Sequence, residues 1–169
     1  SDPAMQGPEI WERREFDGEL GLLRSVVEDL GGESERTTSY AWGEVCGDSV
    51  VLNEILRRIR FPDGTCLVRT YTKVNEARLV EEERLKTALA CLRDYPYGDR
   101  VTRYTYEPVT GQIATVTGPE AFPTGIVPDG FDPFDESDPN YAAYRKHTTY
   151  FEYDLQQTAP GADYPDDLQ

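Results

Sequence analysis

The most reactive side chains in this sequence belong to three cysteines and one histidine. Cys46, Cys66, Cys91 and His147 lie far apart along the chain. A nucleophilic cysteine needs a histidine base and an orienting acid, and no cysteine here has the local signature of such a site. Each cysteine lies among apolar or strand-like residues, so we predict three reduced thiols and, from them, a cytoplasmic location.

The sequence also lacks the short motifs of common catalytic sites. It contains no GxSxG nucleophile elbow, no GxxxxGK[ST] phosphate loop and no GxGxxG dinucleotide fingerprint. One histidine and three scattered cysteines do not have the spacing of zinc ligands. The acids between Asp129 and Asp138 could hold calcium, but prolines interrupt them and their spacing departs from a calcium-binding loop. We therefore predict no catalytic residue, no metal and no cofactor.

Basic side chains gather in one region, around a predicted central hairpin. The cluster consists of Arg57, Arg58, Arg60, Arg69, Lys73 and Arg78. Guanidinium groups bind phosphates and carboxylates, so Arg58, Arg60 and Arg69 form a candidate anion-binding site. The alternative, which we favour, is that the cluster offsets nearby glutamates and docks the acidic C-terminal segment.

Aromatic and acidic side chains alternate in the last part of the chain. Tyrosine offers a large contact area at a small entropy cost, and carboxylates steer a basic partner toward the surface. We predict that these side chains bind a basic protein: Asp129, Phe131, Asp132, Phe134, Asp135, Glu136, Asp138, Tyr150, Glu152, Tyr153 and Asp154. The alternative is that the aromatic residues pack this segment onto the rest of the fold.

One stretch of the sequence resembles a unit of a tyrosine–aspartate repeat, in which a strand leads into a glycine turn. The stretch 103–111 reads Arg-Tyr-Thr-Tyr-Glu-Pro-Val-Thr-Gly, with Glu107 where the repeat has aspartate. The resemblance covers only about fifteen residues, and we find no second copy in the sequence. We therefore interpret the stretch as a hairpin.

The charge of the chain narrows the classes of partner. Its 169 residues include 32 acidic and 17 basic ones, for a net charge of -15 and a pI near 4.4. This charge excludes nucleic-acid binding by the surface as a whole and argues against adhesion to anionic membranes. Residues 119–169 hold 11 acidic and 2 basic residues, so -9 lies there and -6 in the first 118. No apolar run is long enough to cross a membrane, and no signal segment opens the chain.

Hydrophobic periodicity predicts the elements that position these side chains. Helices are expected at 18–30 and 76–93, where apolar residues recur every three or four positions. Residues 49–61 fit a helix or a strand, and we choose a strand for the second half because 61–64 (Phe-Pro-Asp-Gly) is typical of a hairpin turn. Further strands are expected at 37–46, 65–74, 101–106, 112–117 and 147–155.

These elements predict a single α+β domain over residues 9–155. We expect a mainly antiparallel sheet of about five or six strands with two helices packed on one face. Residues 119–140 should form a long, irregular, Pro-rich crossing, and 156–169 a disordered acidic tail. We interpret residues 1–8 as a tag remnant followed by an unstructured start. Short acidic secretion chaperones have a similar order of elements.

Together these patterns favour a non-enzymatic acidic protein that occupies a basic surface of a partner. It would act as an inhibitor or immunity protein of a nucleic-acid-acting enzyme, or as a DNA mimic of the kind found in phage counter-defence. Its carboxylates would take the place of phosphates. The second hypothesis is a small anionic-ligand module or enzyme that uses the arginine-rich hairpin. The third is an acidic secretion chaperone.

Overall fold

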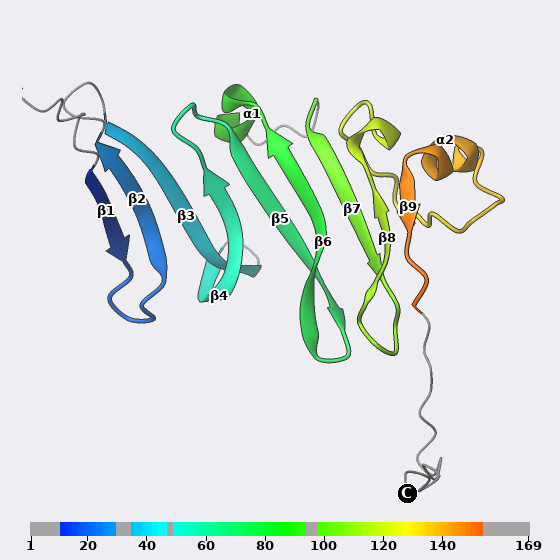
Figure 1. Ribbon diagram of the computed structural model, residues 1–169, viewed down its shortest axis with the longest axis horizontal. Helices are drawn as coiled ribbons and strands as arrows, with labels where there is room; N and C mark the ends of the chain where they lie inside the picture. The colour runs from blue at the N-terminus through cyan, green and yellow to red at the C-terminus, as the bar shows by residue number, and fades with distance from the viewer. Residues whose placement is uncertain (1–10, 30–34, 47–48, 94–97, 154–169) are drawn as a thin grey trace, which may run out of the picture.

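A computed structural model describes residues 11–29, 35–46, 49–93 and 98–153. In these ranges nine strands form one antiparallel sheet, and each strand pairs with the next one along the chain (Figure 1). The strands are β1 (Trp11–Phe16), β2 (Leu23–Asp29), β3 (Glu35–Cys46), β4 (Ser49–Arg60), β5 (Cys66–Val74), β6 (Ala77–Lys86), β7 (Arg100–Tyr106), β8 (Ile113–Thr117) and β9 (Thr148–Tyr150). The helices are α1 (Ala88–Arg93), α2 (Tyr141–Lys146) and a short 3-10 helix, η1 (Pro119–Ala121).

The first eight strands form four hairpins of one design. In each hairpin the second strand carries one extra residue, a β-bulge, beside an aromatic residue of the first strand. The β3–β4 hairpin has a second, larger irregularity between Trp42 and Glu44. The pairs at the bulge are Phe16 with Leu23, Trp42 with Leu56, Tyr71 with Val80, and Tyr106 with Ile113. The four hairpins therefore share the position of their bulge.

The aromatic residue at each later bulge also ties its hairpin to the one before. Trp42 Nε1 donates to the carbonyl of Leu23 at 2.7 Å, and the Tyr71 hydroxyl donates to the carbonyl of Leu56 at 2.7 Å. The Tyr106 hydroxyl donates in the same way to the preceding hairpin, at 2.6 Å from the Val80 oxygen. A bulge disrupts the ladder of main-chain hydrogen bonds. The aromatic side chains therefore supply donors to main-chain carbonyls at the places where the ladder is irregular.

The turns of the first and last hairpins are also alike. Gly21 and Gly111 have φ angles of +66° and +71°, in the left-handed region that favours glycine. The carboxylates of Asp17 and Glu107 each accept hydrogen bonds from the main-chain amides two and three residues further on. Glu107 thus caps the turn of the last hairpin as Asp17 caps that of the first, although the glutamate side chain is one methylene longer.

The two predicted helices are wrong, and with them the α+β fold class. Of the helix predicted at 18–30, the described residues 18–29 form the first turn and β2, because Gly21 reverses the chain where the apolar spacing suggested a helix. Asn75 and Glu76 have φ angles of 49° and 62°, so they form a two-residue hairpin turn instead of a helix cap. Only 88–93 of the second predicted helix is helical. The similarity to secretion chaperones depended on that order of elements and is lost.

Other predictions of local structure are confirmed. The turn at 61–64 forms, with Gly64 at φ +84° and Ile59 opposite Leu67, and all of 49–60 is strand. The strands predicted at 37–46, 65–74, 101–106 and 112–117 match β3, β5, β7 and β8. The last predicted strand, 147–155, is reduced to the short β9, and α2 was not expected. Residues 1–8 and the predicted tail at 156–169 lie outside the described ranges.

The core lies on one face of the sheet, beneath the crossing between β8 and β9. Val101, Ala121, Phe122 and Tyr144 are buried there, and Phe131 packs against them with its ring centroid 5.0 Å from that of Tyr144. Thr115 and Thr117 of β8 are fully buried, and their hydroxyls pair with Thr105 and Thr148. The crossing therefore covers the last three strands of the sheet. No helix in the described ranges is long and apolar enough to cross a membrane.

A disulfide joins Cys66 at the start of β5 to Cys91 of α1, with 5.8 Å between the two Cα atoms. The prediction of three reduced cysteines is therefore wrong for this pair, while the side chain of Cys46 lies outside the part that is described. A cross-link over 25 residues restricts the unfolded chain and typically stabilises a fold by about 3 kcal/mol. It holds α1, a helix of only six residues, against the sheet.

The ties between hairpins can be tested by removing one hydroxyl at a time. We expect Tyr71→Phe and Tyr106→Phe each to lower the free energy of unfolding by about 1 kcal/mol, because each leaves a main-chain carbonyl without its donor. Tyr40→Phe is the matched control, since the Tyr40 hydroxyl has no hydrogen bond in the part of the chain described here. Urea unfolding followed by tryptophan fluorescence measures the difference. Equal stability of all three variants would show that the ties contribute nothing.

The turn caps predict a specific response to acid. Main-chain amides lower the pKa of Asp17, chiefly the amide of Glu19, and that of Glu107, chiefly the amide of Thr110. A folded-state pKa below the unfolded value stabilises the fold above the unfolded pKa, and this contribution is lost as the pH falls through the folded pKa. We expect Asp17→Asn/Glu107→Gln to lose less stability than wild type between about pH 5 and about pH 3. The control is Asp129→Asn/Glu152→Gln, which should follow wild type in urea unfolding across this range.

Candidate interaction surface

The predicted contact segment at 129–138 is a series of tight turns with a period of three residues. Asp132, Asp135 and Asp138 each accept a hydrogen bond from the main-chain amide two residues on, at 2.7–2.9 Å. The amides of Asp135 and Asp138 in turn donate to the carbonyl three residues before. Such turns suit aspartate, whose short side chain reaches its own main chain. The prolines and aspartates thus place successive carboxylates at a regular spacing on the surface.

Two contacts join this segment to β9, which follows it in sequence. The Tyr150 hydroxyl donates to the carbonyl of Pro133 at 2.9 Å, and Pro133 is fully buried. The rings of Phe134 and Tyr150 meet edge to face, with 5.4 Å between their centroids. Phe134 nevertheless remains 55% exposed and Tyr150 37% exposed. The structure therefore brings the two predicted contact segments together and leaves their aromatic rings accessible.

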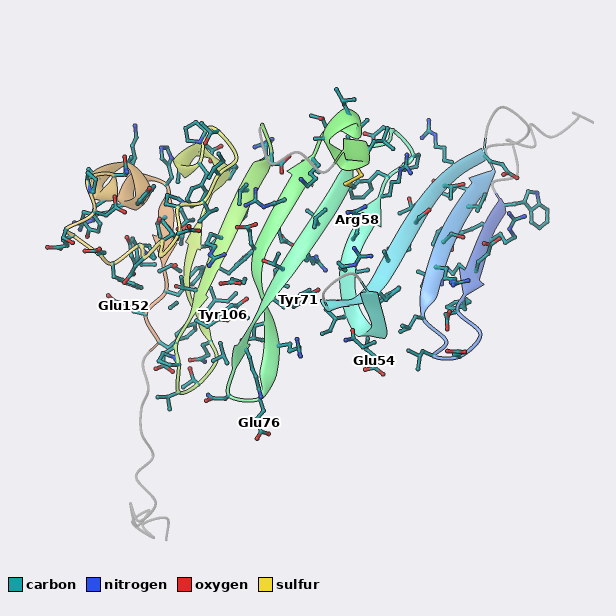
Figure 2. All side chains as sticks on the ribbon, turned by 180° about the vertical axis from the view of Figure 1, so that it is seen from behind. Glu54, Arg58, Tyr71, Glu76, Tyr106 and Glu152 are labelled. Atoms are coloured by element: carbon teal, nitrogen blue, oxygen red, sulfur yellow. A yellow bond between two sulfur atoms is a disulfide. The ribbon has the colours of Figure 1, made fainter. Side chains whose placement is uncertain are left out.

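Most of the predicted contact residues lie on this surface, with two exceptions. Phe131 is half-buried and packs with Phe122 and Tyr144 in the core, so it supports the surface from below. Asp154 lies outside the described residues. The rest form what we call the acidic aromatic surface: Asp129, Asp132, Phe134, Asp135, Glu136, Asp138, Tyr150, Glu152 and Tyr153. Figure 2 shows Glu152 in the segment that leaves β9.

The charges around this surface are mainly negative. The hydroxyl of Ser137 and then its amide lower the pKa of Asp135, which favours the ionised carboxylate. Burial raises the pKa of the Tyr150 hydroxyl, and the nearby Asp132 raises it further, so this phenol stays neutral and can donate to Pro133. The neighbouring bases are Arg145 and Lys146 of α2, and Arg145 lies 6.0 Å from the centre of the Tyr141 ring. The acidic aromatic surface thus carries six carboxylates, and α2 beside it carries two basic side chains.

His147, the only histidine of the sequence, lies at the C-terminal end of α2. Its main-chain carbonyl accepts a hydrogen bond from Gly118, and its amide donates to Tyr144. In the described ranges no group of three or more histidine, cysteine, aspartate or glutamate residues could hold a metal ion. Local structure accounts for the position of this histidine.

The structure separates the three arginines of the predicted anion site. Arg69 bonds to Glu83 at 2.7 Å, and the Tyr104 hydroxyl bonds to the other oxygen of the same carboxylate at 2.9 Å. Burial, together with this carboxylate, raises the pKa of Tyr104 to about 12. Arg58 lies opposite Val68, the neighbour of Arg69, so Arg58 and Arg69 lie on opposite faces of the sheet. Only Arg58 and Arg60 share a face.

The alternative interpretation of the arginine cluster, in which it docks the acidic C-terminal segment, is also wrong for the described residues. The acidic crossing lies beside β7, β8 and β9, at the far end of the sheet from β4 (Figure 1). In the described part of the chain it therefore does not dock on the arginine-rich hairpin. Arg84 contacts the crossing through a bond of 2.6 Å to the carbonyl of Gly125, and Arg100 lies 4.0 Å from the carboxylate of Glu120.

Sequence reasoning missed a buried group of charges between β6 and the start of β7. Lys86 and Asp99 form an ion pair at 2.9 Å with their side chains at most 5% exposed, and Arg84 lies 3.7 Å from the same carboxylate. Arg103 bonds to Glu81 at 2.5 Å and approaches Glu82. The alternating acidic and basic residues of β6 were the sequence signal for this buried group. Because these charges neutralise each other, we assign them a structural role.

The join between the turns and β9 can be tested by hydrogen exchange. We expect Tyr150→Phe to speed amide exchange at 134–138, because loss of the hydroxyl frees the carbonyl of Pro133. Tyr153→Phe removes a hydroxyl that has no hydrogen bond in the described residues and is the control. Exchange measured by mass spectrometry should separate the two variants. The same rate in both would mean that the Tyr150 hydroxyl does not hold the turns.

Comparison of the whole chain with protein-family models, with curated proteins and with solved structures finds no match. The local resemblance of residues 103–111 to a unit of a tyrosine–aspartate repeat therefore describes a hairpin alone. The case for a function depends on the chemistry of the surfaces.

Proposed function

We propose that this chain is a non-enzymatic binding protein whose acidic aromatic surface occupies a basic surface of a partner protein. The observation that carries the proposal is the pairing of Phe134 with Tyr150, which presents two accessible rings among carboxylates from separate segments. Aromatic residues are enriched at the centres of protein interfaces, where they contribute much of the binding energy.

The carboxylates supply the complementary part of the interaction. A surface of one charge attracts a partner of the opposite charge over a distance of about a Debye length, which speeds encounter. A basic surface that normally binds phosphates would accept carboxylates in their place. The partner class is therefore a nucleic-acid-acting protein. The chain would act as its inhibitor or immunity protein, or as a DNA mimic like those of phage counter-defence.

The rigidity of the surface supports the same proposal. Three aspartates are hydrogen-bonded to their own main chain, and the turns are anchored to β9 through Tyr150 and to the core through Phe131. A surface that is already ordered loses little conformational entropy on binding. Its affinity for a partner is correspondingly higher than that of a flexible acidic tail.

The disulfide indicates the kind of compartment in which such an interaction takes place. A cytoplasmic location was expected because all three cysteines were taken to be reduced. Disulfides persist mainly in oxidising compartments, so the bond between Cys66 and Cys91 favours a location outside the reducing cytoplasm. We propose that the chain meets its basic partner in an oxidising compartment or outside the cell, which favours an inhibitor or immunity protein over a DNA mimic of phage counter-defence.

Charge neutralisation with a matched control tests the proposed surface. A basic partner, captured from the native source at low salt and identified, is titrated with wild type and with two triple variants. Asp132→Asn/Asp135→Asn/Glu136→Gln removes carboxylates from the surface, and Glu19→Gln/Glu54→Gln/Glu76→Gln makes the same change in charge elsewhere. We expect the first variant to bind at least about tenfold more weakly at low salt, and wild-type affinity to fall as salt rises.

Two outcomes would refute the proposal. Equal weakening by both triple variants would show that only net charge matters, and an affinity independent of salt would exclude an electrostatic interface. Phe134→Ala then tests the aromatic contribution, since it leaves all charges in place.

A further inference from the structure

At least half of the fourteen arginines in this acidic protein have an acidic partner. A carboxylate oxygen lies within 4.0 Å of each of the following: Arg13, Arg14, Arg24, Arg69, Arg84, Arg100 and Arg103. In the part of the chain that is described, Arg145 of α2 has no such partner, and neither do four neighbouring arginines: Arg36 of β3 and Arg57, Arg58 and Arg60 of β4. Acidic residues outnumber basic ones by 32 to 17, so this local lack of carboxylates is informative.

A groove opens beside these arginines where β3 separates from the β4–β5 turn. Pairing between β3 and β4 reaches only to Ser39 and Arg60, whereas β3 continues back to Glu35 along β2 (Figure 1). The space between holds about 330 Å³ and continues into a wider groove of about 690 Å³. The smaller part is lined by Glu35, Thr37, Ser39, Arg60, Phe61, Pro62 and Gly64.

The donors of the groove lie on one face of the sheet. Ser39 is directly opposite Arg60, and Thr37 lies two residues before Ser39 in β3, so these three side chains point to the same side. Arg58 points to this side as well and lies near the disulfide (Figure 2), but it is not among the residues that line the groove.

The two carboxylates of the groove do not compete for its donors. Asp63 accepts hydrogen bonds from the amide and the hydroxyl of Thr65, at 2.9 and 2.7 Å. Glu35 is four residues from Ser39 along an extended strand, a distance of about 13 Å. The positive end of the groove is therefore at Arg60, and the half-buried ring of Phe61 forms its apolar wall.

We propose that the Arg60 end of this groove binds a small organic anion. A phosphate or carboxylate group would be held by Arg60 and by the hydroxyls of Ser39 and Thr37, and an aromatic or similarly flat body would lie against Phe61 and Pro62. Guanidinium groups bind such oxyanions in a bidentate manner. The volume of 330 Å³ is at the lower end of the range for ligand pockets and suits a small molecule. This site lies on the other half of the sheet from the acidic aromatic surface and is independent of it.

Titration with simple probes tests the site. Phenyl phosphate and benzoate represent the two oxyanion groups, inorganic phosphate lacks the apolar body, and benzyl alcohol lacks the charge. By isothermal titration of the full chain we expect saturable binding of phenyl phosphate or benzoate, and the tighter of the two identifies the preferred group. Arg60→Gln should weaken this binding at least about tenfold. Arg100→Gln, which changes an exposed arginine near Glu120, should leave it unchanged.

Chemical-shift mapping on the wild-type chain locates binding without any variant. Shifts confined to Ser39, Arg60, Phe61 and their neighbours support the proposal, and shifts elsewhere overturn it. It is also overturned if neither anion binds saturably, if benzyl alcohol binds as well as the anions, or if folded Arg60→Gln binds like wild type. None of these results depends on a protein partner, so failure here leaves the proposed function to its own test.

Discussion

The hydrogen bond from an aromatic side chain to the carbonyl beside a bulge is the contact on which the sheet depends. Trp42, Tyr71 and Tyr106 each reach the preceding hairpin through it, so each hairpin orients the next. A sheet with most of its area uncovered buries little apolar surface, and its small core lies under the last three strands. Directional bonds between neighbouring hairpins therefore contribute more to fixing the strand register here than they would in a two-layer fold.

The two proposed sites follow from departures from this regular pattern. After β8 the chain leaves the hairpin design, and the crossing folds over β7–β9 to present Phe134 beside Tyr150. Between β3 and the β4–β5 turn the strands separate, which leaves Arg60 beside an open groove. Elsewhere on the sheet several charges are paired, as in Arg69–Glu83 and Lys86–Asp99.

Local turn chemistry could be predicted from the sequence, but tertiary pairing could not. The turn at 61–64 and the hairpin around Gly111 were recognised because proline and glycine restrict the main chain at defined positions. The strands β2 and β6 were mistaken for helices, since leucines spaced by three or four also fit strands that contain a bulge or follow a left-handed turn. The four hairpins share one aromatic and one aliphatic residue at the bulge, a pattern too sparse to find before the register is known. The accessible turns at 129–138 could be anticipated because aspartate and proline mark them, while their role in binding stays a prediction.

The sequential order of the strands has a consequence for how the molecule unfolds. Because every strand pairs with the strands next to it in sequence, folding can start at any hairpin and spread along the array. Stability in such an array is a sum of unit and neighbour contributions, so one end can open while the other stays folded. The strands around Arg60 and those below Tyr150 therefore need not melt as one cooperative block. A ligand or partner that binds one half will protect that half first.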